Sequence, residues 1–167
     1  MAKVSSDIGS KPLRRRSPRN AWQVPYMRVV EHLEAWGHPN ITAKNRTTFE
    51  FTKEGHLTPR GDCIVGVKAD KGARDLVPEF KALAKNPSAV ITVEMTVNAM
   101  RIVVLGRGSP ALSFSHPTDL VGRRSSYTCG RTLMIRADRG AKDFPRELVE
   151  AMRNPLERAH VALTVEV

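Results

Sequence analysis

The chain has 167 residues, of which 41% are hydrophobic and 26% charged, so it can bury the core of one globular domain. No apolar run approaches the ~20 residues of a membrane span, and no apolar segment follows the N-terminus as in a secretory signal, so we expect a cytoplasmic protein without membrane contact. Two cysteines and five scattered histidines form no disulfide framework and show no metal-ligand spacing, so neither a metal nor a cofactor is expected.

Residues 1–20 hold half of the net charge of +10. They carry six Lys or Arg side chains against the single carboxylate of Asp7, with few apolar residues. A segment of this composition cannot order itself by burial, so we predict a disordered basic arm. Its cations would gain from RNA phosphates by releasing counterions, and a merely solvated arm is the alternative. The candidate RNA contacts are Lys11, Arg14, Arg15, Arg16 and Arg19.

After the arm, a single domain is predicted over residues 21–167, and it begins with a helix. Pro25 suits the first turn of this helix and Gly37 its end. Apolar side chains recur at every third position between them, at Met27, Val30, Leu33 and Trp36. From residue 41 to 52 the apolar and polar side chains alternate instead, which predicts a half-buried strand.

The rest of the chain carries the same unit twice. Residues 68–87 align with residues 136–155 without a gap; eight of these twenty pairs are identical and six more are conservative. Each copy predicts an apolar strand, an Asp-x-Gly-Ala turn, a short helix that ends at Asn-Pro, and an alternating strand. The alternation predicts that one core receives Phe49, Phe51, Ile91, Val93, Val161, Leu163 and Val165.

We therefore predict an α+β, β-rich fold built from two interlocked strand–strand–helix–strand copies, one over about residues 41–99 and one over about 101–167. Six main strands favour a small closed six-stranded barrel, because closure removes exposed strand edges. The sequence Pro59-Arg60-Gly61-Asp62 before an apolar strand resembles the Gly-Asp turn of cradle-loop barrels, although the second copy has Cys129-Gly130 there.

Two groups of residues are candidates for an anion site. The glycine-rich segment around Arg107 and Gly108 offers backbone amides for a phosphate, and a tight turn between strands is the favoured alternative. The second group lies at predicted strand ends and would form a polar mouth of the barrel. It consists of Arg60, Asp62, Asp70 and Lys71. The alternative for its aspartates is that they bond to nearby turn amides.

A loop in the second copy combines guanidinium groups with an aromatic ring. Arg123, Arg124 and Arg131 lie close in sequence to Tyr127, and such mixing suits RNA phosphates and exposed bases. A solvated surface loop is the alternative. No histidine can be paired from sequence with either cysteine, so no catalytic residue is assigned.

Several strings of residues resemble a known family over about residues 37–155. They include Arg46-Thr47-Thr48-Phe49-Glu50, Leu57-Thr58-Pro59-Arg60-Gly61-Asp62-Cys63, Gly106-Arg107-Gly108-Ser109-Pro110 and Cys129-Gly130-Arg131. The stretch is similar to an archaeal family known as domain of unknown function 371. The resemblance implies an archaeal source and brings no established activity, and the basic arm lies outside it.

Charge and loop composition together predict a non-enzymatic RNA- or nucleoprotein-binding protein, associated with the ribosome or with translation. The alternative is an enzyme or a small-anion-binding protein that uses the polar mouth. The sequence leaves the oligomeric state open.

Overall fold

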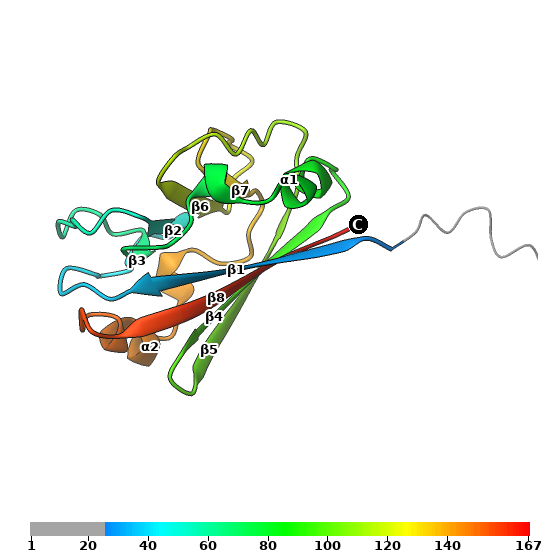
Figure 1. Ribbon diagram of the computed structural model, residues 1–167. Coiled ribbons are helices and arrows are strands. Elements are labelled where there is room, and N and C mark those ends of the chain that lie inside the picture. The colour runs from blue at the N-terminus through cyan, green and yellow to red at the C-terminus, as the bar shows by residue number, and fades with distance from the viewer. Residues whose placement is uncertain (1–25) are drawn as a thin grey trace, which may run out of the picture.

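The computed structural model of the protein describes residues 26–167 and shows an α+β fold with two four-stranded sheets (Figure 1). The basic arm of residues 1–20 lies outside the described residues. The strand order is β1-β8-β4-β5 in the first sheet and β3-β2-β6-β7 in the second. No helix within the described range is long and apolar enough to cross a membrane.

In chain order, with 3-10 helices marked η, the elements are β1 (Arg28–Trp36), β2 (Thr48–Thr52), β3 (Ile64–Gly66), η1 (Ala73–Asp75), α1 (Pro78–Ala84), β4 (Val90–Val97), β5 (Met100–Arg107), β6 (Asp119–Arg123), β7 (Thr132–Met134), η2 (Ala141–Asp143), α2 (Arg146–Ala151) and β8 (Arg158–Glu166).

One hydrophobic core joins the two sheets. Along β4 every second residue is buried, as expected for a strand with one face in the core. The residues predicted to share this core are all fully buried, namely Phe49, Phe51, Ile91, Val93, Val161, Leu163 and Val165. The predicted common apolar face is therefore confirmed.

The predicted N-terminal helix is wrong, because residues 28–36 form strand β1. This strand pairs antiparallel with the whole of β8. Burial alternates from Glu31 to Ala35, whereas Met27 and Val30, two of the apolar residues spaced by three, are 51% and 39% exposed. The long partner strand supplies the backbone hydrogen bonds that a helix would have made locally, so strand pairing overrides the local pattern.

The predicted closed six-stranded barrel is also wrong. Eight strands form two separate sheets, and within residues 26–167 only isolated bridges connect their edges. These bridges are Trp36–Val67 and Arg107–Ile135. Strands β3 and β7 are three residues long, and after each of them the chain turns through a left-handed residue, Lys68 or Arg136, with φ of 51°. Because the chain leaves the strand direction there, no continuous ladder closes the sheets.

The internal duplication is visible in the strand pairing. The first half runs β1-β2-β3-α1-β4 and the second half runs β5-β6-β7-α2-β8. The halves are interlocked, since β1 pairs with β8 of the second half and β5 pairs with β4 of the first. Even the left-handed residues recur, with φ of 47° at both Ala43 and Phe114. The repeated unit therefore begins with β1 and β5; the predicted second copy includes β5, whereas the predicted first copy leaves out β1.

Candidate functional site

Two residues of the predicted polar mouth are fastened to β1. The backbone amide of Glu34 donates a hydrogen bond to Asp70 Oδ1 at 3.0 Å, so Asp70 ties the turn after β3 to this strand. Lys71 Nζ forms an ion pair of 2.7 Å with Glu31, whose side chain is only 5% exposed. Both side chains are thus engaged in holding the fold together.

The other two residues of the mouth precede β3. Asp62 Oδ1 accepts a hydrogen bond from the side-chain amide of Asn45 at 3.1 Å. Arg60 is exposed and takes part in none of the ion pairs found within residues 26–167. The contacts of Asp62, Asp70 and Lys71 therefore fall on β1 and on the loop around Asn45, and they do not gather these side chains around one ligand position.

The glycine-rich segment uses its amides inside the fold. The amides of Arg107, Gly108 and Ser109 donate to three backbone carbonyls at distances of 2.8 to 3.0 Å. A Cβ atom on Gly108 would lie 2.3 Å from the carbonyl oxygen of Ala84. Glycine is required here because the end of β5 packs against the end of α1, and these amides are not free to cradle a phosphate.

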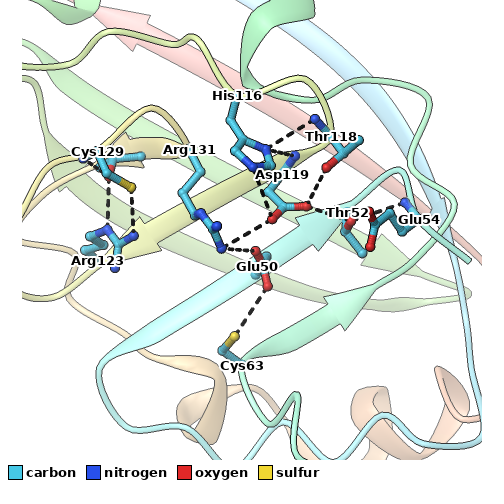
Figure 2. A network of polar contacts seen from close by, with 11 residues as sticks. Glu50, Thr52, Glu54, Cys63, His116, Thr118, Asp119, Arg123, Cys129 and Arg131 are labelled. Atoms are coloured by element: carbon cyan, nitrogen blue, oxygen red, sulfur yellow. Dashed lines mark hydrogen bonds and ion pairs between the residues drawn. The ribbon is translucent and has the colours of Figure 1, made fainter. Parts of the chain in front are cut away.

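A buried polar network lies on the outer face of the second sheet (Figure 2). Phe49 and Phe51 of β2 point into the core, so Glu50 between them points to the opposite face. Asp119 begins β6, the neighbouring strand. Arg131 Nη1 lies 3.6 Å from Glu50 Oε1 and 3.3 Å from Asp119 Oδ2. One cation therefore bridges two carboxyl groups, of which Glu50 is only 6% exposed.

Asp119 is surrounded by hydrogen-bond donors. Thr52 and Thr118 donate their hydroxyl groups to its Oδ1 at 2.8 and 2.9 Å. His116 Nδ1 accepts backbone amides, which places the proton of the neutral ring on Nε2, 3.9 Å from Asp119 Oδ2. Burial raises the pKa of Asp119, but the hydrogen bonds outweigh burial, so the pKa lies below its ordinary value.

Glu50 has the opposite surroundings. Burial raises the pKa of Glu50 to about 7, and the charge of Asp119 acts in the same direction. Its Oε1 has no hydrogen-bond partner among the described residues, while Cys63 donates to Oε2 at 3.5 Å. Burial also raises the pKa of Cys63 to about 12, so this thiol is no nucleophile near neutral pH. Of this carboxyl pair, Glu50 therefore titrates near pH 7, whereas Asp119 loses its proton at a lower pH.

Arg123, a predicted RNA contact, is the last residue of β6, and its side chain is held by the segment that leads into β7. It donates to Thr132 Oγ1 at 3.0 Å and to Cys129 Sγ at 3.3 Å. Its guanidinium carbon lies 4.9 Å from the centre of the Tyr127 ring. Burial raises the pKa of Cys129, but the bonds from the Arg131 amide, Thr132 and Arg123 outweigh it and lower the pKa. Arg123 therefore orders its own loop.

Positive charge gathers instead around an open pocket of about 730 Å³ between the two halves. The pocket is lined by Lys44, Arg46, Lys142, Phe144, Pro145 and Arg146. Lys44 and Arg46 follow β1 in the first half, and the other residues run from η2 into α2 of the second half. Among the ion pairs found within residues 26–167, none involves any of the four cations, which we call the basic pocket cluster.

Backbone hydrogen bonds between the halves fix the walls of this pocket. The amide of Lys142 donates to the carbonyl of Asn45 at 2.8 Å. Asn45 Oδ1 accepts the amides of the second and third residues after it, which turns the chain between the two cations of the first wall. Arg146 Nη2 lies 3.0 Å from the carbonyls of both Ala43 and Ala141. One guanidinium group therefore ties the wall of the first half to that of the second.

Of the predicted RNA contacts, Arg124 lies at the rim of this pocket. Its Nη1 is 3.5 Å from the carbonyl oxygen of Arg46 and 3.8 Å from Asp143 Oδ2. Arg123 and Arg131 belong instead to the loop and the carboxyl network described above. The remaining predicted contacts lie outside the described residues; they are Lys11, Arg14, Arg15, Arg16 and Arg19.

Sequence reasoning misses the basic pocket cluster. Lys44 and Arg46 lie on the polar side of a predicted strand, and such positions usually face solvent. A comparison of the two halves could have found it. When the halves are aligned from β1 and β5, Lys44 and Arg46 of the first half correspond to the uncharged Ser115 and Pro117 of the second. The cations of this wall are therefore confined to one of two otherwise similar units.

The comparisons with known proteins agree with the predicted resemblance. A family described as "Domain of unknown function (DUF371)" matches residues 33–166. The chain belongs to this family. An uncharacterized protein of the archaeon Methanocaldococcus jannaschii is 44% identical over 125 residues, which cover 75% of this chain and 92% of that protein. The family match includes every residue that lines the basic pocket, whereas the basic arm precedes it.

Proposed function

We propose that this protein binds RNA through its phosphate groups, with the basic pocket as the principal contact surface. The observation that carries the proposal is the basic pocket cluster itself: four cationic side chains line one pocket, and no carboxylate within residues 26–167 pairs with them. Grouped cations that no carboxylate neutralises repel one another and gain when phosphates approach.

The exposure of these cations favours a polyanion over a small anion. Lys44, Arg46 and Lys142 are exposed, so their electrostatic attraction for a single small anion is weakened by water and salt. A nucleic-acid strand brings several phosphates and releases condensed counterions when the cations neutralise them. Pro145 is exposed beside these cations and adds an apolar surface on which a sugar can lie, as at nucleic-acid interfaces that contact both phosphate and sugar.

The basic arm supplies further cationic side chains for phosphate contacts. Residues 1–20 carry six cationic side chains on a chain whose net charge is +10. An arm of this kind adds phosphate contacts without sequence preference, so the pocket and the arm would act together on a long RNA. The ribosome is the large RNA-containing partner that we propose, in keeping with a translation-associated role.

Binding of fluorescent RNA at several salt concentrations tests the proposal. Replacing Lys44, Arg46 and Lys142 together by alanine should weaken binding and lower the slope of log K against log salt by about 2, at about 0.7 for each phosphate of a single strand that is no longer neutralised. Arg146 is left unchanged in this variant, because it holds the two walls together.

A control variant removes the same charge elsewhere. Arg74, the counterpart of Lys142 in the first half, is replaced by alanine together with Lys85 and Arg101, and all three are exposed. This variant should keep nearly the wild-type slope. Equal slopes for the pocket variant and the wild type would overturn the proposal, as would tighter binding to DNA of the same sequence. Co-sedimentation with ribosomes at moderate salt, abolished at high salt, is expected for the full chain.

A further inference from the structure

Tyr127 is an exposed aromatic side chain in the loop between β6 and β7. It is 62% exposed, and among residues 26–167 the other large aromatic side chain with comparable exposure is Tyr26. Exposed rings on proteins that bind single-stranded nucleic acid serve as surfaces on which bases stack. The ring therefore raises the question of what stacks on it.

The ring is held in place before any ligand arrives. Arg123 lies over it with its guanidinium carbon 4.9 Å from the ring centre. That guanidinium is itself fixed by Thr132 and Cys129, at 3.0 and 3.3 Å. The amide of Tyr127 donates to Ser125 Oγ at 3.3 Å. One face of the ring is thus covered by a cation, and the exposed part remains as a prearranged platform.

The platform is tied to the basic pocket through Arg124. The amide of this residue donates to the carbonyl of Thr47 at 2.9 Å, and its guanidinium reaches the carbonyl of Arg46 at 3.5 Å. Tyr127 follows three residues later, so its Cα lies within about 11 Å of that of Arg124 by chain reach. The loop that carries Tyr127 therefore begins at the rim of the basic pocket.

We infer that an unpaired base of the bound RNA stacks on the exposed face of Tyr127, while the adjacent phosphates lie on the basic pocket cluster. This inference rests on the proposed function and names its ligand as single-stranded RNA. A base inside a duplex cannot offer its face to a side chain without leaving the stack, whereas an unpaired base can. Arg123 behind the ring adds a cation–π contact and keeps the ring oriented.

Binding of a single-stranded RNA and its duplex to matched variants tests the inference. Tyr127→Ala should weaken binding to the single strand by roughly fivefold to a hundredfold, the usual loss for one stacked base. Tyr127→Phe should bind as the wild type does, because the ring and not the hydroxyl group makes the contact. Neither change should alter affinity for the duplex, and neither should alter the salt slope, because no charge is removed.

The outcomes separate this inference from the proposed function. Equal loss for single strand and duplex, or no loss for Tyr127→Ala, would overturn stacking on Tyr127. If one of these two results is found while the alanine variant of Lys44, Arg46 and Lys142 still shows its reduced slope, the stacking inference fails and the proposed function stands. Quenching of the Tyr127 fluorescence by the single strand, measured as the difference between the wild type and Tyr127→Ala, gives direct support.

Discussion

Two carboxyl groups on paired strands hold their protons differently. Asp119 is ionised because hydroxyl groups donate to it, and Glu50 is protonated at acidic pH because it is buried with one unpartnered oxygen. The pKa of Glu50 rises from 4.5 to about 7 on folding, so the folded state binds more protons than the unfolded state in this window. The stability gained from this group is full below the lower value and is lost as the pH rises through the upper one.

Replacing Glu50 by glutamine should remove this pH dependence. Relative to the wild type, Glu50→Gln should gain on the order of 3 kcal/mol of unfolding free energy between about pH 4.5 and 8, because each unit of pKa shift is worth about 1.4 kcal/mol. Urea unfolding at a series of pH values measures the difference. Glu150→Gln is the control, since its side chain is 77% exposed, and it should run parallel to the wild type. A parallel curve for Glu50→Gln would contradict the burial argument.

At the scale of the elements, close backbone approach joins the strands to the helices. A Cβ on Gly108 would lie 2.3 Å from the carbonyl oxygen of Ala84 at the end of α1. Gly108→Ala should therefore cost about 1–3 kcal/mol of unfolding free energy, the usual effect of overpacking a rigid site. Urea denaturation of the two proteins measures the loss.

Gly55→Ala serves as the control for this change. A Cβ there would meet only the flexible side chain of Lys68, at 3.0 Å or more, and Gly55 is exposed. Its effect should stay within about half a kilocalorie per mole, as for ordinary surface positions. Equal stabilities of the two variants would show that the end of β5 can move away from α1.

The sequence predicted the repeated elements better than the elements that connect the halves. The strand–turn–helix–strand order follows from residues 68–87 and 136–155, because both copies keep the turn and helix-ending residues. Strand β1 could not be predicted, since its apolar residues fit a spacing of three and its partner β8 lies at the other end of the chain. Long-range pairing decides such ambiguous segments, and a local pattern does not contain it.

The candidate site likewise contains residues that the local sequence predicts and residues that only the fold brings together. Arg124 was predicted because arginines and a tyrosine cluster locally in the sequence. Lys44 and Lys142 could not be joined from sequence, because they meet where a loop of the first half bonds to η2 of the second. The Glu50 and Asp119 pair likewise depends on the register between β2 and β6.

At the scale of the whole molecule, the interlocked strands make each half depend on the other. Apart from one isolated bridge each, β1 pairs with β8 and β5 pairs with β4 within residues 26–167. Fragments 1–98 and 99–167, separated in the hairpin between β4 and β5, should therefore be unfolded or self-associated when alone. Mixing them should restore a folded one-to-one complex, seen by circular dichroism and by sedimentation. A fragment that folds as a monomer would contradict the mutual dependence of the two halves, whereas a folded dimer of one fragment would agree with it.

Deleting residues 1–20 tests whether the arm acts on the same ligand as the pocket. The deletion removes six cationic side chains and one carboxylate. Affinity should fall for all RNA sequences alike, because phosphate contacts carry no sequence information, and the salt slope should flatten by about 0.7 for each phosphate of a single strand that the arm had neutralised. The truncated protein should keep its preference for single strands over duplex, since Tyr127 is retained. Unchanged affinity and slope would exclude the arm from binding and leave the pocket as the whole interface. If both surfaces bind one RNA, combining the deletion with alanine at Lys44, Arg46 and Lys142 should lower the salt slope by the sum of the two separate losses.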